Sequence, residues 1–255
     1  MKYAINLLSV IPMRKEPAHR SEMVSQLLFG EYAEVIGKSK EFLKIKCLYD
    51  TYEGWVQAKQ LEIVDAIKET DDFTASFSSK VLINDQPMII PFGSSIHDVR
   101  KPAFVIGNNE VRYTITVKNY WNNKALPFDE YNLETVYTHF LNAPYLWGGK
   151  SVFGIDCSGF VQQSFKMFGI KLLRDAYLQA TQGKEIKTLR TAKPCDLAFF
   201  KSDKGRVTHV GIILSNNRIV HASGKVRIDS IDKDGIINKE TGERTHKLHS
   251  IKRFS

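Results

Sequence analysis

The chain has 255 residues, of which 43% are hydrophobic and 25% are charged, proportions that indicate a globular protein and exclude a fibrous or disordered one. Its length suits two or three domains, and its apolar runs fall well short of the ~20 residues that cross a membrane. The net charge is +8, but the basic residues are scattered and form neither a basic block nor a basic helix, which argues against a nucleic-acid partner. The positive charge would attract an acidic peptide or cell-wall fragment.

The first ten residues contain one lysine and several apolar residues, but Asn6 and Ser9 interrupt the apolar run and Pro12 follows it. No small-residue cleavage site is present, so the segment favours a β-strand over a signal peptide. We therefore expect a cytoplasmic protein. A periplasmic or secreted location is the alternative if a signal peptide has been removed.

The three cysteines, Cys47, Cys157 and Cys195, form an odd and low number without paired spacing. They indicate no disulfide framework, and no Cys or His pair has the short spacing of zinc ligands. We expect neither a metal nor another cofactor. Cys47 lies within an apolar run, which predicts a place in a hydrophobic core.

Residues 1–65 contain short apolar runs separated by Pro, Gly, Ser and charged residues, a pattern typical of a small all-β barrel. Three motifs of this segment resemble those of bacterial SH3-like domains and occur in the same order. They are Met13-Arg14-Lys15-Glu16-Pro17, Leu27-Leu28-Phe29-Gly30-Glu31 and Tyr52-Glu53-Gly54-Trp55-Val56.

Residues 66–122 again show short strand-like runs, and the last of these, residues 111–117, alternates between apolar and polar side chains as a half-buried strand does. We interpret this segment as a second, degenerate SH3-like barrel. The polar linkers at residues 65–72 and 119–127 are short, which favours packed domains over freely tethered ones.

Residues 123–255 combine helices with a following antiparallel sheet. An apolar stripe predicts a helix over residues 128–142, and strands are expected at residues 196–200, 207–214 and 218–222. A helix that precedes an antiparallel sheet is typical of an α+β domain.

Cys157 is the central candidate in this region. Apolar residues recur at helical spacing after it, at Phe160, Val161, Phe165 and Phe168, and Gly169 suits a helix C-terminus. Cys157 is thus expected at a helix N-terminus, where backbone N–H groups and the helix dipole favour the thiolate. This is a suitable place for a catalytic nucleophile.

Two of the seven histidines, His209 and His221, lie inside apolar strands downstream of Cys157. If the hairpin loop is residues 215–217, Leu214 pairs with Arg218, Gly211 faces His221, and His209 lies diagonally on the same face. A two-residue loop would put the two imidazoles on opposite faces. We therefore predict the odd loop and a base–orienter pair of histidines.

The ordered motifs Asp156-Cys157-Ser158-Gly159-Phe160-Val161, Thr208-His209-Val210-Gly211-Ile212 and His221-Ala222-Ser223 resemble those of the NlpC family of cell-wall peptidases, over about residues 127–225. The resemblance implies a papain-like α+β catalytic domain, which would follow the two small SH3-like barrels predicted above. The family's tyrosine twelve residues before the nucleophile corresponds to Tyr145. Its Pro-Gly-Asp-Leu motif corresponds to Pro194-Cys195-Asp196-Leu197, with Cys195 in place of glycine.

The resemblance further implies hydrolysis of the γ-D-glutamyl–diamino acid bond of peptidoglycan peptides. Cys157 would be the nucleophile, His209 the base, His221 its orienter, and Tyr145 an oxyanion donor. The resemblance also implies substrate binding by Asp156, Ser158 and Asp175. Asp156 could be a plain N-cap of the Cys157 helix, and for Asp175 an N-cap role in a helix at residues 176–183 is an equal alternative.

In relatives of this layout, resembling muropeptide-recycling peptidases, the first barrel captures the free amine of an N-terminal L-alanine. That resemblance implies Glu22 and Tyr52 as partners of the ammonium, with Asp156 as the third. The alternatives are a solvated loop charge for Glu22 and a barrel-edge aromatic for Tyr52.

Other functions remain open from the sequence: a papain-like amidase or acyltransferase, and a cell-wall-binding module whose catalytic domain is vestigial. The expected partner is a peptidoglycan-derived peptide, with no nucleic acid and no membrane, and a monomer is favoured. The diamino acid is either lysine or diaminopimelate.

Overall fold

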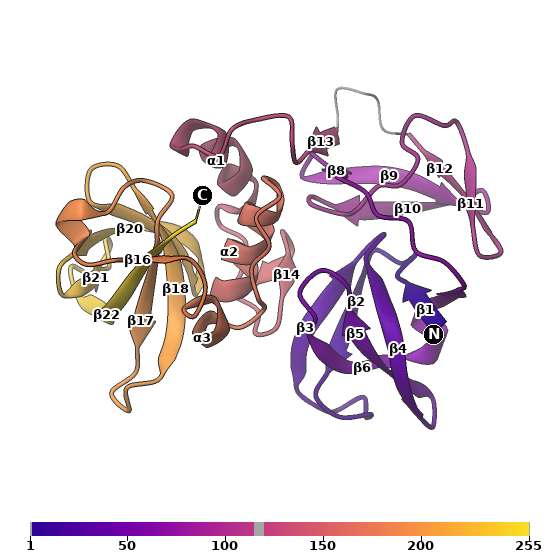
Figure 1. Ribbon diagram of the computed structural model, residues 1–255, viewed down its shortest axis with the longest axis horizontal. Coiled ribbons are helices and arrows are strands. Elements are labelled where there is room, and N and C mark those ends of the chain that lie inside the picture. The colour runs from indigo at the N-terminus through magenta and orange to yellow at the C-terminus, as the bar shows by residue number, and fades with distance from the viewer. Residues whose placement is uncertain (1, 115–119, 255) are drawn as a thin grey trace. The chain divides into compact units, whose positions relative to one another are not determined.

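The computed structural model describes residues 2–114 and 120–254. The chain forms two compact units (Figure 1). Unit 1 contains Met1–Ala125 and Trp147–Phe153, and unit 2 contains Leu126–Leu146 and Gly154–Ser255. The seven residues from Trp147 to Phe153 therefore pack with unit 1 although unit 2 precedes and follows them in the chain. The predicted boundaries at residues 65 and 122 remain predictions.

The first part of unit 1 is a seven-stranded antiparallel sheet in the order β3-β2-β6-β5-β4-β1-β7. Burial alternates along β2 and β5, which turns Ile11, Met13 and Ile45 inward, and Cys47 joins the same core as predicted. The strands are β1 (Lys2–Ile5), β2 (Val10–Arg14), β3 (Met23–Leu28), β4 (Tyr32–Ser39), β5 (Phe42–Cys47), β6 (Glu53–Gln57) and β7 (Glu62–Val64), with the 3₁₀ helix η1 (Ala58–Gln60) before β7.

The second part of unit 1 is a four-stranded antiparallel sheet, β10-β9-β12-β11, and a two-stranded one, β13-β8. Its strands are β8 (Asp72–Thr74), β9 (Ser78–Ile83), β10 (Gln86–Pro91), β11 (Phe104–Ile106), β12 (Asn109–Tyr113) and β13 (Tyr120–Asn122). The strand predicted over residues 111–117 is present to Tyr113, and its residues 115–117 lie outside the described part of the chain.

A second barrel is not confirmed, because the two parts of unit 1 share one hydrophobic core. Ile5 of β1 and Phe29, the residue after β3, pack in the same cluster as Val81, Ile90 and Val111 of the second sheet. The apolar runs of residues 66–122 therefore pack partly against residues of the first segment. Strand density alone could not distinguish this arrangement from an independent barrel.

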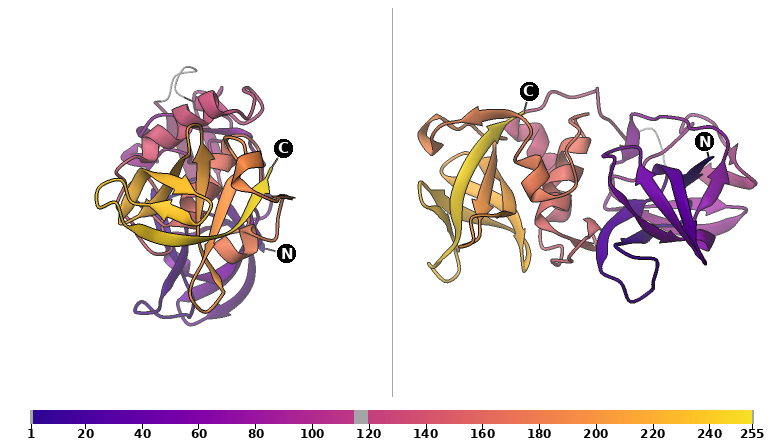
Figure 2. Two further views of the ribbon diagram at one scale, coloured as in Figure 1. Left: turned by 90° about the vertical axis from the view of Figure 1, so that its left-hand side faces the viewer. Right: turned by 60° about the horizontal axis from the view of Figure 1, so that its bottom comes forward.

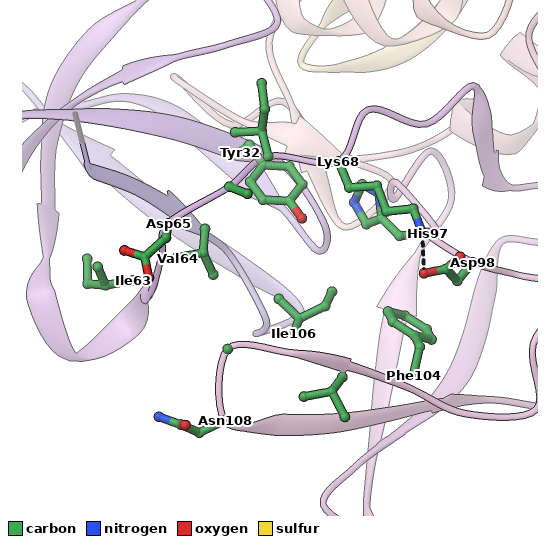
Figure 3. A pocket seen from close by; sticks show the side chains of 14 residues that line it. Tyr32, Ile63, Val64, Asp65, Lys68, His97, Asp98, Phe104, Ile106 and Asn108 are labelled. Atoms are coloured by element: carbon green, nitrogen blue, oxygen red, sulfur yellow. Dashed lines mark ion pairs between the residues drawn. The ribbon is translucent and has the colours of Figure 1, made fainter.

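A cavity of ≈ 680 Å³ lies in unit 1. Figure 3 shows the side chains that line it, among them Tyr32, His97 and Phe104, and the ion pair between Lys68 and Asp98. None of the predicted site residues is among the described residues that line this cavity.

Unit 2 has helices on one side of an antiparallel sheet (Figures 1 and 2). The sheet order is β16-β22-β17-β18-β19-β20-β21, and a further pairing of β21 with β22 closes the last six strands into a ring. The strands are β15 (Gly154–Ile155), β16 (Lys184–Ile186), β17 (Leu197–Lys201), β18 (Val207–Leu214), β19 (Arg218–Ser223), β20 (Lys225–Asp232), β21 (Gly235–Ile237) and β22 (Arg244–Arg253); β14 (Lys150–Ser151) belongs to unit 1.

The helices of unit 2 are shorter than predicted; α2 and α3 begin at the predicted residues 157 and 176, whereas α1 begins two residues after the predicted start. The helix expected at residues 128–142 is α1 (Glu130–Tyr137) followed by the 3₁₀ helix η3 (Thr138–Phe140), and Asp129 caps it by accepting from the Asn132 N–H at 2.9 Å. The remaining helices are α2 (Cys157–Lys166), α3 (Ala176–Gln179) and the 3₁₀ helix η4 (Leu189–Thr191). Among the described residues, no helix is long and apolar enough to cross a membrane.

Candidate active site

Cys157 is the first residue of α2, as predicted. The helix starts there because the Asp156 carboxylate accepts from the Gly159 N–H at 2.7 Å. At the other end Gly169 has φ +73°, and the Ile170 N–H donates to the Phe165 carbonyl at 3.2 Å, which closes the last turn. The helix packs against β18 and β19 and so fixes Cys157 beside those strands.

Asp156 does more than cap the helix. Its two carboxylate oxygens accept from the Arg174 guanidinium at 3.0 and 2.7 Å, and Arg174 also donates to the Ser158 hydroxyl at 3.0 Å. Arg174 is only 1% exposed. This bidentate, buried ion pair holds the residues on both sides of Cys157 in place. Arg174 was not among the predicted site residues, because a single arginine in a loop carries no recognisable sequence pattern.

The two histidines lie on a hairpin with the predicted register. Leu214 pairs with Arg218 and Gly211 with His221, around a three-residue loop in which Asn216 and Asn217 have φ values of +60° and +54°. A Cβ built on Gly211 would lie 2.9 Å from the Cβ of His221. Only glycine leaves room for the His221 ring at this position.

His209 and His221 meet directly. His209 Nε2 lies 2.9 Å from His221 Nδ1, and His221 Nε2 lies 3.0 Å from a carboxylate oxygen of Asp229 on β20. Because the carboxylate can only accept, His221 donates from Nε2, and its Nδ1 then accepts from His209 Nε2–H. This chain leaves the lone pair of His209 on Nδ1, the nitrogen nearer its own backbone.

Asp229 is a buried carboxylate with several donors. Burial alone would raise its pKa, but the hydrogen bonds from His221, the Lys239 N–H and Arg227 together hold the pKa of this carboxyl well below its usual range. Asp229 is therefore ionised. It supplies the negative charge behind the second histidine that a histidine alone would lack.

The Cys157 thiol contacts the backbone of β18, the strand that carries His209. Its sulfur is 4.0 Å from the carbonyl oxygen of Thr208, the residue before His209. Tyr145 bridges to Ile155, two residues before Cys157, and is 36% exposed. Burial raises the pKa of Tyr145, and the nearby Cys157 and Asp156 raise it further, so its hydroxyl is a donor at neutral pH.

The pKa of Cys157 is shifted in the direction opposite to the one expected at a helix start, where a thiolate would be favoured. Burial raises the pKa of Cys157 to about 12, and the nearby Asp156 charge adds to this, outweighing the lowering by backbone N–H groups. Burial, together with the neighbouring histidines His246 and His221, lowers the pKa of His209 well below 6.5. Desolvation thus favours the neutral thiol and the neutral imidazole, against the effect of the helix dipole.

The remaining predicted residues occupy other positions. Asp175 is the N-cap residue of α3, and its carbonyl oxygen accepts from the Leu178 and Gln179 N–H groups. In unit 1, Glu22 accepts from the Trp147 indole N–H at 2.9 Å, and Tyr52 packs against the core of the first sheet. The helix predicted at residues 176–183 ends at Gln179.

Comparison with known families agrees with these motifs. Residues 142–245 match the NlpC/P60 family, and residues 13–61 match the bacterial dipeptidyl-peptidase Sh3 domain. The chain contains an NlpC/P60 domain that follows a bacterial dipeptidyl-peptidase SH3 domain.

Several curated proteins are similar. The γ-D-glutamyl-L-lysine dipeptidyl-peptidase of Bacillus subtilis is 28% identical over 221 residues, covering 78% of this chain and 71% of the relative. Dipeptidyl-peptidase 6 of Lysinibacillus sphaericus is 25% identical over 261 residues, covering 90% and 92%. The murein DD-endopeptidase MepS/murein LD-carboxypeptidase of Escherichia coli is 44% identical over 91 residues, covering 34% and 46%.

Solved structures share the fold. An NlpC/P60 family protein from Bacillus cereus matches with a TM-score of 0.80 over 98% of this chain and 99% of that chain, at 19% identity. An NlpC/P60 endopeptidase from Photobacterium damselae matches with a TM-score of 0.73 over 97% and 70%, at 18% identity. At 19% and 18% identity, these structural matches show a shared fold and nothing more specific.

The sequence could also have predicted Asp229, by applying the same register reasoning to the next hairpin, which joins β19 to β20 in the NlpC/P60 domain. Gly224, with φ +70°, marks a turn after His221, and the register pairs His221 with Arg227. Asp229 is then the diagonal neighbour of His221 on the same face.

Proposed function

We propose that this protein is a cysteine peptidase that hydrolyses the γ-D-glutamyl–L-diamino acid bond of peptidoglycan stem peptides. The observation that carries the proposal is the hydrogen-bonded chain His209–His221–Asp229 beside a cysteine at a helix start. It contains the three parts that a covalent acyl-transfer site needs: a nucleophile, a base and a group that orients the base.

In the first half of the reaction, His209 Nδ1 takes the proton of the Cys157 thiol while the sulfur attacks the γ-carbonyl carbon of D-glutamate. The resulting imidazolium is stabilised through His221 by the ionised Asp229. The tetrahedral intermediate then collapses. His209 gives its proton to the departing amine of the diamino acid, and a thioester remains on Cys157.

In the second half, water replaces the amine. His209 takes a proton from the water, whose oxygen attacks the thioester carbonyl, and collapse returns the proton to the Cys157 sulfur. The oxyanion of each tetrahedral intermediate accepts from the Cys157 backbone N–H and from the Tyr145 hydroxyl, each such donor being worth about 3 kcal/mol. Asp156, Ser158 and Asp175 are proposed to contact the substrate.

The direct test is mass spectrometry of purified stem tripeptides and tetrapeptides, with lysine or diaminopimelate, incubated with the protein. Cleavage between D-glutamate and the diamino acid is expected, and Cys157→Ala should abolish it. The variants Cys47→Ala and Cys195→Ala serve as controls that keep activity. Transfer to an added amine in preference to water would instead indicate an acyltransferase, and intact peptides after incubation with wild type would indicate a vestigial site.

We further propose that the preferred substrate has a free N-terminal L-alanine. Two observations support this: the match of residues 13–61 to a dipeptidyl-peptidase SH3 domain, and the half-exposed Glu22, which the Trp147 indole holds in a fixed orientation. An acidic side chain of this kind suits an ammonium group.

The kinetic test compares a stem peptide carrying a free amine with the same peptide acetylated there. Wild type is expected to prefer the free peptide, and Glu22→Ala to lose this preference. Glu16→Ala, an exposed charge of the same loop, is the matched control. Equal kcat/KM of wild type for both peptides would remove the amine preference while leaving the peptidase assignment intact.

A further inference from the structure

His246 on β22 lies against the proposed base. Its ring stacks on the His209 ring, with centroids 4.1 Å apart and planes at 25°. Phe200 contacts both imidazoles, at 5.7 Å from His209 and 5.9 Å from His246. Together with His221, whose ring centroid is 5.8 Å from that of His246, these side chains form a cluster of four rings.

The backbone explains why a residue so far along the chain reaches this place. β22 pairs with β17 on one side and with β21 on the other, and His246 lies opposite Ile236. The pairing of β22 with β17 shifts register beside Phe200, and such a bulge redirects side chains locally. The ring closure of the sheet therefore brings His246 to His209.

A hydrogen bond to His221 fixes one nitrogen of His209 but leaves the plane of its ring free to tilt. Rotation of imidazole about χ2 is broad rather than confined to sharp wells. A flat ring stacked on its face removes this freedom, so the His209 Nδ1 lone pair keeps one direction. Two contacts, one in the plane of the ring and one on its face, determine the orientation of the base.

The groups that face His246 are His209 from β18, His221 from β19, Asp229 from β20 and the hydroxyl of its neighbour Thr245, 2.8 Å from its Nδ1. Burial and the neighbouring His221 lower the pKa of His246 to about 4, with Asp229 opposing. His246 is therefore neutral at physiological pH, and its ring can lie on His209 without repelling the imidazolium that forms during the reaction.

We propose that His246 is a positioning residue: its stacked ring holds the His209 imidazole in the plane from which Nδ1 accepts the Cys157 proton. The inference rests on the proposed role of His209. Another planar ring of similar size at position 246 should hold His209 equally well, whereas a non-planar side chain that only fills the same volume should not.

The experiment compares wild type, His246→Phe, which keeps a flat ring, and His246→Leu, which keeps bulk without a plane. His249→Ala, an exposed histidine of the same strand, is the matched control. Three quantities are measured: kcat and KM on a stem peptide, the rate of Cys157 alkylation by iodoacetamide against pH, and the ¹⁵N shifts of the His209 imidazole.

For His246→Leu we expect kcat to fall about tenfold with KM unchanged, since positioning errors act on the chemical step. Alkylation of Cys157 should slow in parallel, and the ¹⁵N resonances of the His209 imidazole should shift and broaden because the ring samples more than one orientation. His246→Phe and His249→Ala should stay within about threefold of wild type in both rates. If His246→Leu does not fold, His246→Gln replaces it in the comparison with His246→Phe.

Wild-type alkylation rates and ¹⁵N shifts in the leucine variant would overturn the proposal, as would equal losses for the phenylalanine and leucine variants. Alkylation and ¹⁵N shifts need no substrate. A wild-type protein that leaves stem peptides intact would therefore contradict the proposed function, while the role of His246 would still be decided by the variants.

Discussion

Asp229 is the residue that determines the direction of the hydrogen bonds at the site. Because it accepts from His221 Nε2, it determines which nitrogen of His221 accepts and therefore which nitrogen of His209 is basic. Removing its charge while keeping its shape isolates this effect.

Asp229→Asn should lower kcat by roughly 10²-fold, because the amide can donate to His221 and thereby reverse the chain of hydrogen bonds. The measurement is steady-state turnover on the stem peptide. Asp232→Asn on the same strand, where the carboxylate pairs with Arg244 instead, is the control and should retain activity. Full activity of Asp229→Asn would show that His221 needs no orienting charge.

The pH dependence of alkylation follows from the pKa directions of Cys157 and His209. With the pKa of the thiol near 12 and that of the imidazole well below 6.5, both groups are neutral across the physiological range. The rate of Cys157 alkylation by iodoacetamide should therefore rise with pH through pH 8 and 9, without a plateau from pH 5 to 8. Such a plateau would indicate a preformed thiolate–imidazolium pair.

Cys195 occupies a backbone position that suits glycine. Its φ is +73°, and its N–H donates to the Ile213 carbonyl, so the turn keeps its geometry despite the side chain. A left-handed conformation costs a residue with a Cβ roughly 1–2 kcal/mol. The free energy of unfolding of Cys195→Gly should therefore exceed that of Cys195→Ala by about 1 kcal/mol. Chemical denaturation should show this as a higher midpoint for Cys195→Gly. Equal stabilities would show that this turn carries no strain.

At the scale of elements, the β18–β19 hairpin places the two histidines. Gly211→Ala puts a methyl group 2.8 Å from an Ile219 atom and 2.9 Å from the His221 Cβ, closer than side chains approach. We expect His221 to shift and kcat to fall by about 10², while circular dichroism stays that of wild type. Gly205→Ala, in a turn with open space around the glycine, is the control for activity.

The hairpin was predictable because two local rules combine. Period-two alternation assigns each side chain to a face, and loop length sets the register. The start of α2 was equally predictable from the Asp156 cap and the apolar stripe after Cys157.

The partners from distant segments were not predictable in this way. His246 and Arg174 reach the site through sheet closure and a loop, and no short-range pattern in the sequence specifies either. The protonation of Cys157 could not be derived from the sequence either, because the helix dipole follows from a local pattern whereas the burial that raises the pKa of Cys157 follows from tertiary packing.

At the scale of the whole molecule, a buried ion pair fixes the segment Trp147–Phe153 within unit 1. Lys150 is 1% exposed and its ammonium lies 3.1 Å from a carboxylate oxygen of Glu31, which is 7% exposed. The Lys150 N–H also donates to the Gln26 side chain at 2.8 Å. Replacing only one partner of such an ion pair is strongly destabilising, because the charge of the other partner stays buried without compensation.

Lys150→Met should destabilise unit 1 by roughly 3 kcal/mol, and adding Glu31→Gln should restore much of the loss. Unfolding is followed by tryptophan fluorescence, since Trp55, Trp121 and Trp147 all belong to unit 1. Lys44→Met, which breaks the exposed pair with Glu53, is the control and should cost less than about 1 kcal/mol. Equal effects of Lys150→Met and Lys44→Met would contradict the burial argument.

The discontinuous course of unit 1 also determines how the chain can be recombined. Trp147–Phe153 folds with the β-sheets of the first 125 residues and is followed after three residues by Cys157. A chimera that exchanges only the first 125 residues would leave this segment facing a foreign β surface. A chimera must therefore exchange both segments of unit 1 together. It needs three crossover points: one near residue 125, one before Trp147 and one after Phe153.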